Sequence, residues 1–106
     1  MQKVNLFNLP HSLDLTEEVF QPLVTNERVL IERIISKAHI TPEGQWYDQS
    51  KNEWVMVLKG GAELTFITGD KVRLTAGEAI ELPAHCQHRV SWTSTDEETL
   101  WLAVHY

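Results

Sequence analysis

The chain has few of the features that mark secreted or nucleic-acid-binding proteins. Its single cysteine, Cys86, cannot form an internal disulfide, and its first twenty residues lack the basic start and unbroken apolar stretch of a secretion signal. We therefore expect it in the reducing cytoplasm. Nine Lys and Arg against fifteen Asp and Glu give a formal net charge of −6, which disfavours nucleic acid or an anionic membrane as a partner. No apolar run approaches the roughly 18 residues that a membrane-spanning helix needs.

The common catalytic motifs are also lacking. The sequence contains no His-Glu-x-x-His, no lysine-bearing glycine-rich loop for phosphate, no Cys-x-x-Cys and no nucleophile elbow. It has no internal repeats and no low-complexity linker, and its 106 residues suit one domain. We therefore predict a single domain over residues 1–106, with a core barrel over about residues 28–106, and we expect the functional site inside that fold.

Short strand patterns dominate the second half of the chain. Apolar or alternating runs are separated by turn residues, and the expected strands are residues 53–59, 62–67, 71–75, 79–82, 88–92 and 99–106. Short strands at this spacing are typical of an all-β sandwich or a small barrel. The fold class that we predict is therefore all-β.

The first half of the chain carries weaker signals. Residues 4–7 could form a short strand, and residues 16–20 have the capping residue and early acids of a short helical turn. Residues 28–40 are rich in Val, Ile and Leu, but Arg33 and Lys37 interrupt the apolar alternation. We expect a partly exposed strand there. An amphipathic helix is the alternative, which the β-branched content disfavours.

A proline corner directs one histidine into the fold. Pro83 ends a short apolar run, and the chain resumes as a strand at His88. If that strand alternates, His88, Val90 and Trp92 share one face. We therefore expect His88 to start an apolar row that points inward.

The strand over residues 53–59 has two different faces. Alternation places Glu53 with two valines on the inner face, and Trp54, Met56 and Leu58 on the outer face. An outer apolar row needs cover. We therefore predict a homodimer that packs through this sheet or through the N-terminal strands.

Two spaced patterns resemble the motifs of the cupin family. The stretch Glu53-Trp-Val-Met-Val-Leu-Lys-Gly60 is similar to the latter half of the first cupin motif, and Gly77, Pro83 and His88 stand in the register of the second. The patterns occur in the right order and are separated by a hairpin. The resemblance implies a double-stranded β-helix, or jelly roll, with a short N-terminal extension and a ligand or metal pocket in the barrel mouth.

The first motif departs from the family pattern. Cupins hold a metal with a His-x-His pair, a glutamate and the histidine of the second motif. In this chain the positions of the pair fall on Trp46 and Asp48 or, with a shorter gap, on Tyr47 and Gln49. The resemblance therefore implies a metal site without its usual histidine pair.

A candidate ligand set for a divalent transition metal (Mn, Fe, Ni or Zn) still follows from the resemblance. Asp48, Glu53 and His88 could form a three-ligand face, with His85 or Gln49 as a fourth ligand. Structural interpretations stand beside this one. Asp48 could stabilise a turn, Glu53 could be a solvated edge residue, and His88 could be a core histidine bonded to the backbone.

Two more side chains are candidates for the barrel interior. His105 shares strand parity with Trp101 and Ala103, so it could line the barrel, although a packing role is the favoured interpretation. Cys86 lies between His85 and His88, but a lone thiol is more often a small buried filler than a ligand.

The functional prediction is a metal-dependent enzyme that acts on a small molecule as a dioxygenase, isomerase or lyase. Without a metal, Glu53 and His88 could still pair as base and acid for an isomerase or lyase. The alternative is a non-catalytic binding or sensor barrel without metal, which holds a small apolar ligand between aromatic walls.

Overall fold

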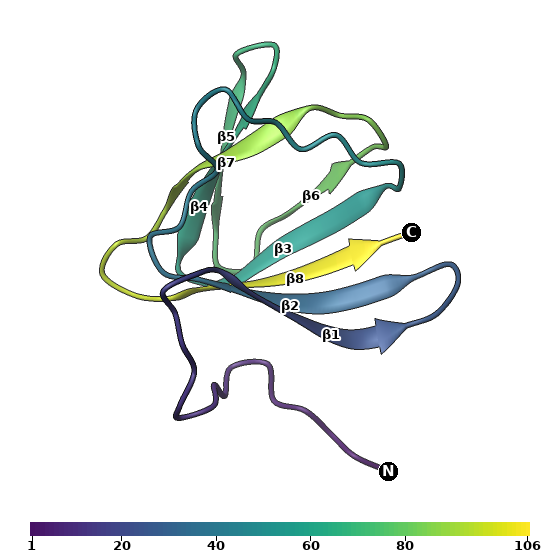
Figure 1. Cartoon of the computed structure of the whole chain (residues 1–106), viewed down its shortest axis with the longest axis vertical. Coiled ribbons are helices and arrows are strands. Elements are labelled where there is room, and N and C mark those ends of the chain that lie inside the picture. The colour runs from purple at the N-terminus through teal and green to yellow at the C-terminus, as the bar shows by residue number, and fades with distance from the viewer.

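Eight strands make up the fold in the computed structural model, which describes residues 1–106. They are β1 (Val19–Thr25), β2 (Leu30–Ser36), β3 (Glu53–Lys59), β4 (Gly61–Phe66), β5 (Lys71–Thr75), β6 (Ala79–Leu82), β7 (His88–Thr93) and β8 (Thr99–His105). They form two antiparallel sheets, one in the order β1-β2-β8-β3-β6 and one in the order β5-β4-β7 (Figure 1). This architecture confirms the predicted all-β, jelly-roll fold class. None of these elements is a helix of the length and apolarity that a bilayer crossing requires.

The strands after residue 52 follow the sequence pattern closely. β3, β5 and β6 begin and end at the predicted residues, and β4, β7 and β8 differ by one residue at one or both ends. Their bounds were predictable because each lies between local turn signals, which act over a few residues and do not depend on the rest of the fold.

The core fills the space between the two sheets. Val55 and Val57 of β3, Leu64 of β4, Leu74 of β5 and Trp101 of β8 are all nearly inaccessible to solvent and belong to one packed cluster. Each such side chain contributes about 1.5–3 kcal/mol through burial. The two valines lie on the inner face of β3, as the alternation predicts.

The N-terminal part of the fold differs from the predictions. Residues 4–7 form no strand, and residues 16–20 form no helical turn, since β1 begins at Val19. The barrel strands therefore start ahead of residue 28. The expectation of a partly exposed strand over residues 28–40 was also wrong, because β2 lies between β1 and β8 and its last five residues are buried.

Arg33 is buried because the segment before β1 folds over it. Its Nη1 donates hydrogen bonds to the carbonyl oxygens of Leu6 (3.0 Å) and Asn8 (2.8 Å), and its Nε donates to Gln21 Oε1 (2.7 Å). A buried guanidinium is tolerated when its donors are paired in this way. The arginine that resembled a solvated residue in sequence therefore ties the N-terminal segment to the outer face of β2.

A register shift in β7 turns one predicted inward residue outward. Leu64 of β4 pairs with Val90, whereas the preceding Glu63 pairs with Trp92, so Ser91 is an extra residue on β7. A β-bulge of this kind reverses the side-chain alternation after it. His88 and Val90 line the interior as predicted, but the prediction for Trp92 was wrong. Its ring lies outside, 4.2 Å below the guanidinium carbon of Arg73.

The segment between β2 and β3 runs along the free edge of β7. The backbone N–H of Thr41 donates to the carbonyl of Val90 (2.8 Å), and Tyr47 and His88 exchange both backbone hydrogen bonds (2.7 and 3.2 Å). The segment therefore pairs with β7 at separate points, and its isolated bridge brings Tyr47 beside His88.

The outer face of β3 carries the predicted apolar row. Trp54 is 36% exposed, and Met56 and Leu58 are partly buried. The homodimer inferred from this row stays a prediction.

Candidate functional site in the barrel

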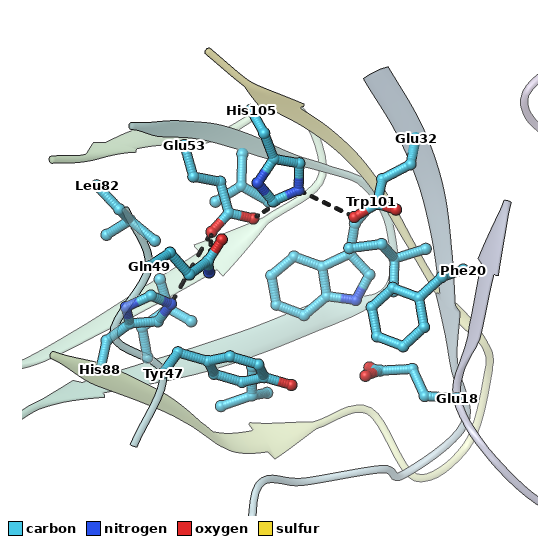
Figure 2. A pocket seen from close by; sticks show the side chains of 14 residues that line it. Glu18, Phe20, Glu32, Tyr47, Gln49, Glu53, Leu82, His88, Trp101 and His105 are labelled. Atoms are coloured by element: carbon cyan, nitrogen blue, oxygen red, sulfur yellow. Dashed lines mark hydrogen bonds and ion pairs between the residues drawn. The ribbon is translucent and has the colours of Figure 1, made fainter. Parts of the chain in front are cut away.

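A cavity of about 350 Å³ opens between the two sheets. Its lining combines carboxyl groups, imidazoles and aromatic rings, and the residues that matter below are Glu18, Glu32, Glu53, His88, His105, Phe20, Tyr47, Trp101 and Gln49. No lysine or arginine lines it. Figure 2 shows the Glu53 carboxyl between the imidazoles of His88 and His105, with Glu18 and Phe20 across the pocket.

Glu53 is the first residue of β3, and the strand pairing fixes its position. The strand pairs with β6 and β8, so Glu53 lies between Leu82 and His105 in register. The residue is only 8% exposed. Its Oε1 accepts a hydrogen bond from Gln49 Nε2 (3.4 Å) and lies 4.0 Å from His88 Nε2, whereas its Oε2 lies 3.9 Å from His105 Nε2. Oε2 therefore has no hydrogen-bond partner in the protein.

His88 is the first residue of β7, in the opposite sheet. Its Nδ1 lies 2.8 Å from the carbonyl oxygen of Cys86, and because a carbonyl can only accept, this nitrogen carries a proton. Nε2 is left facing Glu53. The ring of Tyr47 stacks against the imidazole at 5.5 Å between centroids. The prediction that Glu53 and His88 meet inside the barrel therefore agrees with the structure.

His105, for which a packing role was the favoured interpretation, belongs to the pocket. It ends β8, and its Nε2 lies 2.9 Å from Glu32 Oε1 on the neighbouring strand β2. Because the carboxylate can only accept, His105 Nε2 donates this bond. Both side chains are nearly buried. Glu32, His105 and Glu53 therefore form a row along the inner face of the larger sheet, with the imidazole between the two carboxyls.

A second polar group lies across the pocket. The indole Nε1 of Trp101 donates to Ser36 Oγ (3.1 Å), and the Ser36 hydroxyl donates to a carboxyl oxygen of Glu18. Burial raises the pKa of Glu18, although the bond from Ser36 opposes that shift. This chain of bonds orients both the indole and the carboxyl that face the cavity.

Burial also raises the pKa of Glu53 above its ordinary value. The nearby imidazoles of His105 and His88 and the hydrogen bond from Gln49 act against the shift, and the charge of Glu32 adds to it. A carboxyl with a raised pKa holds its proton to higher pH and is a stronger base once it is ionised.

The raised pKa predicts how stability depends on pH. The folded state keeps the Glu53 proton to higher pH than the unfolded chain, so its contribution to stability falls as pH rises from the ordinary glutamate range through the raised pKa. Glu53→Gln removes this loss. We expect the free energy of unfolding of the variant, relative to the natural protein, to increase with pH by up to about 1.4 kcal/mol per unit in that window.

Urea unfolding between pH 4.5 and 8 measures this difference. Glu43→Gln is the control, because Glu43 is an exposed carboxyl outside the pocket. A pH-independent difference for Glu53→Gln would contradict the raised pKa.

Asp48 and His85 lie apart from the pocket lining. They pair with each other, with 2.7 Å between Asp48 Oδ1 and His85 Nδ1, and their side chains are 43% and 69% exposed. His85 has a left-handed φ of 63°, a backbone conformation that side chains other than glycine rarely adopt. The structure therefore brings Glu53 and His88 together but not the other two predicted ligands with them.

These donors do not fit the predicted metal site. No group of three or more His, Cys, Asp and Glu side chains is arranged to hold a metal ion. Asp48 lies outside any assigned turn, and its exposed carboxylate pairs with His85 instead. The Cys86 thiol is also outside the pocket lining, and only its backbone carbonyl acts on the site, through His88.

The exposed pair of Asp48 and His85 leads to a prediction about stability. Asp48→Asn should change the free energy of unfolding by less than about 1 kcal/mol, because exposed ion pairs contribute little. Chemical denaturation measures it. A loss of several kcal/mol would show that the pair is structurally essential.

Sequence reasoning missed two carboxyls of the site. Glu32 alternates with Ile34 on the inner face of β2, and that period was a usable signal. Glu18 lies just before β1, which the sequence did not predict, so no local pattern pointed to it.

Comparison with known proteins identifies the family. The family model described as "Cupin domain" matches residues 37–105. No functionally curated protein matches. A solved structure from Ralstonia eutropha JMP134, described provisionally as a mannose-6-phosphate isomerase, is 41% identical, covers 99% of this chain and 97% of its own, and has a TM-score of 0.89.

Two more distant structures share the fold. A cupin superfamily protein of Desulfitobacterium hafniense DCB-2 is 18% identical, with 96% and 97% of the two chains covered and a TM-score of 0.72. TT1209 from Thermus thermophilus is 19% identical, with 99% and 96% covered and a TM-score of 0.79. With the family model matching most of the chain and a relative of this similarity along its whole length, the protein belongs to the cupin family as a small single-barrel member.

Proposed function

We propose that the barrel is the site of an isomerase that moves a proton on a small carbonyl compound. The observation that carries the proposal is Glu53. Its carboxyl group lies between two imidazoles, its side chain is nine-tenths buried, and its Oε2 has no hydrogen-bond partner. A buried carboxyl with a free oxygen and a raised pKa has the properties of a general base.

The roles follow from the geometry. Glu53 takes the proton from the carbon next to the substrate carbonyl, and the electron pair of the broken carbon–hydrogen bond moves to the carbonyl oxygen. His88, when protonated at Nε2, gives that proton to the oxygen. In the second half the transfers run in reverse on the adjacent carbon and oxygen, so the reaction needs no oxidant and takes up no net proton.

Three features support these roles. The bond from His88 Nδ1 to the Cys86 carbonyl directs Nε2 into the pocket. The stacked ring of Tyr47 holds the imidazole plane. The apolar surroundings of Leu64 and Leu82 limit water around Glu53. No step uses a metal, because the predicted donors do not converge.

The similarity to the Ralstonia protein supports the isomerase class, since that protein is described provisionally as a mannose-6-phosphate isomerase. We carry over the class of reaction and test the substrate separately. The cavity, at about 350 Å³, has room for a small molecule of this kind.

Isomerisation in deuterium oxide tests the proposal. Mannose and mannose 6-phosphate are incubated with the protein, with and without EDTA, and NMR follows ketose formation and deuterium at the carbon next to the carbonyl. We expect conversion of one sugar with deuterium incorporation, unchanged by EDTA. Conversion that EDTA abolishes, or conversion that Glu53→Gln leaves unchanged, would contradict metal-free transfer through Glu53; ligand binding with no conversion would favour the non-catalytic binding barrel.

A further inference from the structure

The pocket lining has more acidic than basic side chains. Three carboxyl side chains, Glu18, Glu32 and Glu53, line it, and no lysine or arginine does. When all three carboxyls are ionised, they outnumber the imidazoles of His88 and His105 even if both imidazoles are protonated. The fold has no helix, so no helix N-terminus offers backbone N–H groups to an anion either.

Each carboxyl keeps an oxygen that the protein does not bond. Glu53 Oε2 has no hydrogen-bond partner, Glu32 is bonded through Oε1 alone, and Glu18 accepts from Ser36 through Oε2 alone. Glu53 and Glu32 have side chains that are nine-tenths buried. Free oxygens on mostly buried carboxyl side chains that line a cavity are acceptors that a ligand can satisfy.

Aromatic rings lie between these acceptors. Phe20 and Trp101 stand on the Glu18 side, and Tyr47 on the His88 side (Figure 2). Aromatic faces attract organic cations and cover flat carbon skeletons. The pocket thus offers free acceptors and aromatic faces, and lacks the fixed positive groups that hold phosphate or carboxylate.

We propose that this pocket selects small ligands that carry an ammonium group and rejects phosphorylated or carboxylated ones. The inference rests on the proposed function only in placing the substrate in this same pocket. The ammonium group donates to the free oxygens of Glu32 and Glu53, and the carbon part of the ligand lies against the aromatic rings. A sugar phosphate would meet three carboxyls and no lysine or arginine.

Three probes of nearly equal shape test the charge preference. Benzylammonium, benzyl alcohol and benzoate are titrated into the protein by isothermal calorimetry, with mannose 6-phosphate as a second anion. We expect benzylammonium to bind at least about tenfold more tightly than benzyl alcohol, and both anions to bind more weakly than the alcohol.

Glu32→Gln is the informative variant because it keeps the shape of the side chain. It should weaken benzylammonium binding by about fivefold or more and leave benzyl alcohol binding unchanged, which also shows that the variant is folded. Glu43→Gln, an exposed carboxyl outside the pocket, should change neither.

Each outcome separates the two proposals. Equal or tighter binding of an anion, absence of benzylammonium binding in the millimolar range, or a Glu32→Gln variant with undiminished ammonium preference overturns the ligand class. Ammonium preference without any proton transfer on a substrate leaves the ligand class standing and overturns the isomerase. Conversion of mannose 6-phosphate together with anion preference leaves the isomerase standing and overturns the ligand class.

Discussion

Glu53→Gln should lower the rate of deuterium incorporation into the product at least about 100-fold. A positioned general base contributes about 10²–10⁴ to a proton-transfer rate, and glutamine cannot accept the proton. The amide keeps nearly the same volume, so the pocket should still bind a neutral ligand. NMR rates in deuterium oxide with the converted sugar measure the effect, and benzyl alcohol titration checks the pocket.

The pH dependence of activity is a second test of the role of Glu53. Because burial raises the Glu53 pKa, activity in the natural protein should rise with pH through that pKa, as the carboxyl ionises. Asp48→Asn is the matched control, since Asp48 is an exposed carboxylate outside the pocket. A Glu53→Gln variant that retains more than about a tenth of the natural rate would remove Glu53 from the reaction.

Gly60→Ala should destabilise the protein by about 2–4 kcal/mol. Gly60 joins β3 to β4 with a left-handed φ of 80°, and a Cβ at this position would lie 2.7 Å from Thr99 Oγ1 and 2.8 Å from the Glu98 carbonyl oxygen. Backbone atoms cannot move aside as a flexible side chain can. The substitution therefore adds a steric clash to the backbone strain, and urea unfolding measures the sum.

Gly69→Ala isolates the strain from the clash. Gly69 has a similar φ of 94°, but a Cβ there meets no atom within 4 Å. We expect a loss of only about 1–2 kcal/mol. Equal losses at the two positions would show that the close approach to β8 costs nothing.

The second half of the fold could be predicted because its information is local. Turn residues bound β3 to β8, and the alternation in β3 placed Glu53 on the inner face, where it meets His88. The spaced cupin patterns added the relation between these two distant residues. The pairing of carboxyl and imidazole was therefore available from the sequence.

The rest of the site depends on contacts that no short window contains. His105 reaches the pocket because β8 pairs with β2 and β3 in a particular register, which also places it beside Glu32. Asp48 fits the spacing of a ligand but lies in an exposed irregular segment, where it meets His85 instead. Spacing along the chain could indicate a site, but not the direction of a side chain on a loop.

The N-terminal errors have a different cause. Arg33 and Lys37 led to the expectation of a partly exposed strand, because hydrophobic alternation ranks charged residues as exposed. The burial of Arg33 depends on the carbonyl groups of Leu6 and Asn8, which lie far back along the chain. When a segment this distant in sequence covers a strand, the strand's own residues do not show that it is buried.

The segment that runs along β7 has a consequence for self-association. Open sheet edges recruit strands from other molecules, and here Thr41 and Tyr47 occupy that edge with their own backbone. The same Tyr47 forms a wall of the cavity. Any change that loosens this segment would both move the Tyr47 wall of the cavity and uncover the unpaired edge of β7, so a wider cavity and aggregation should increase together.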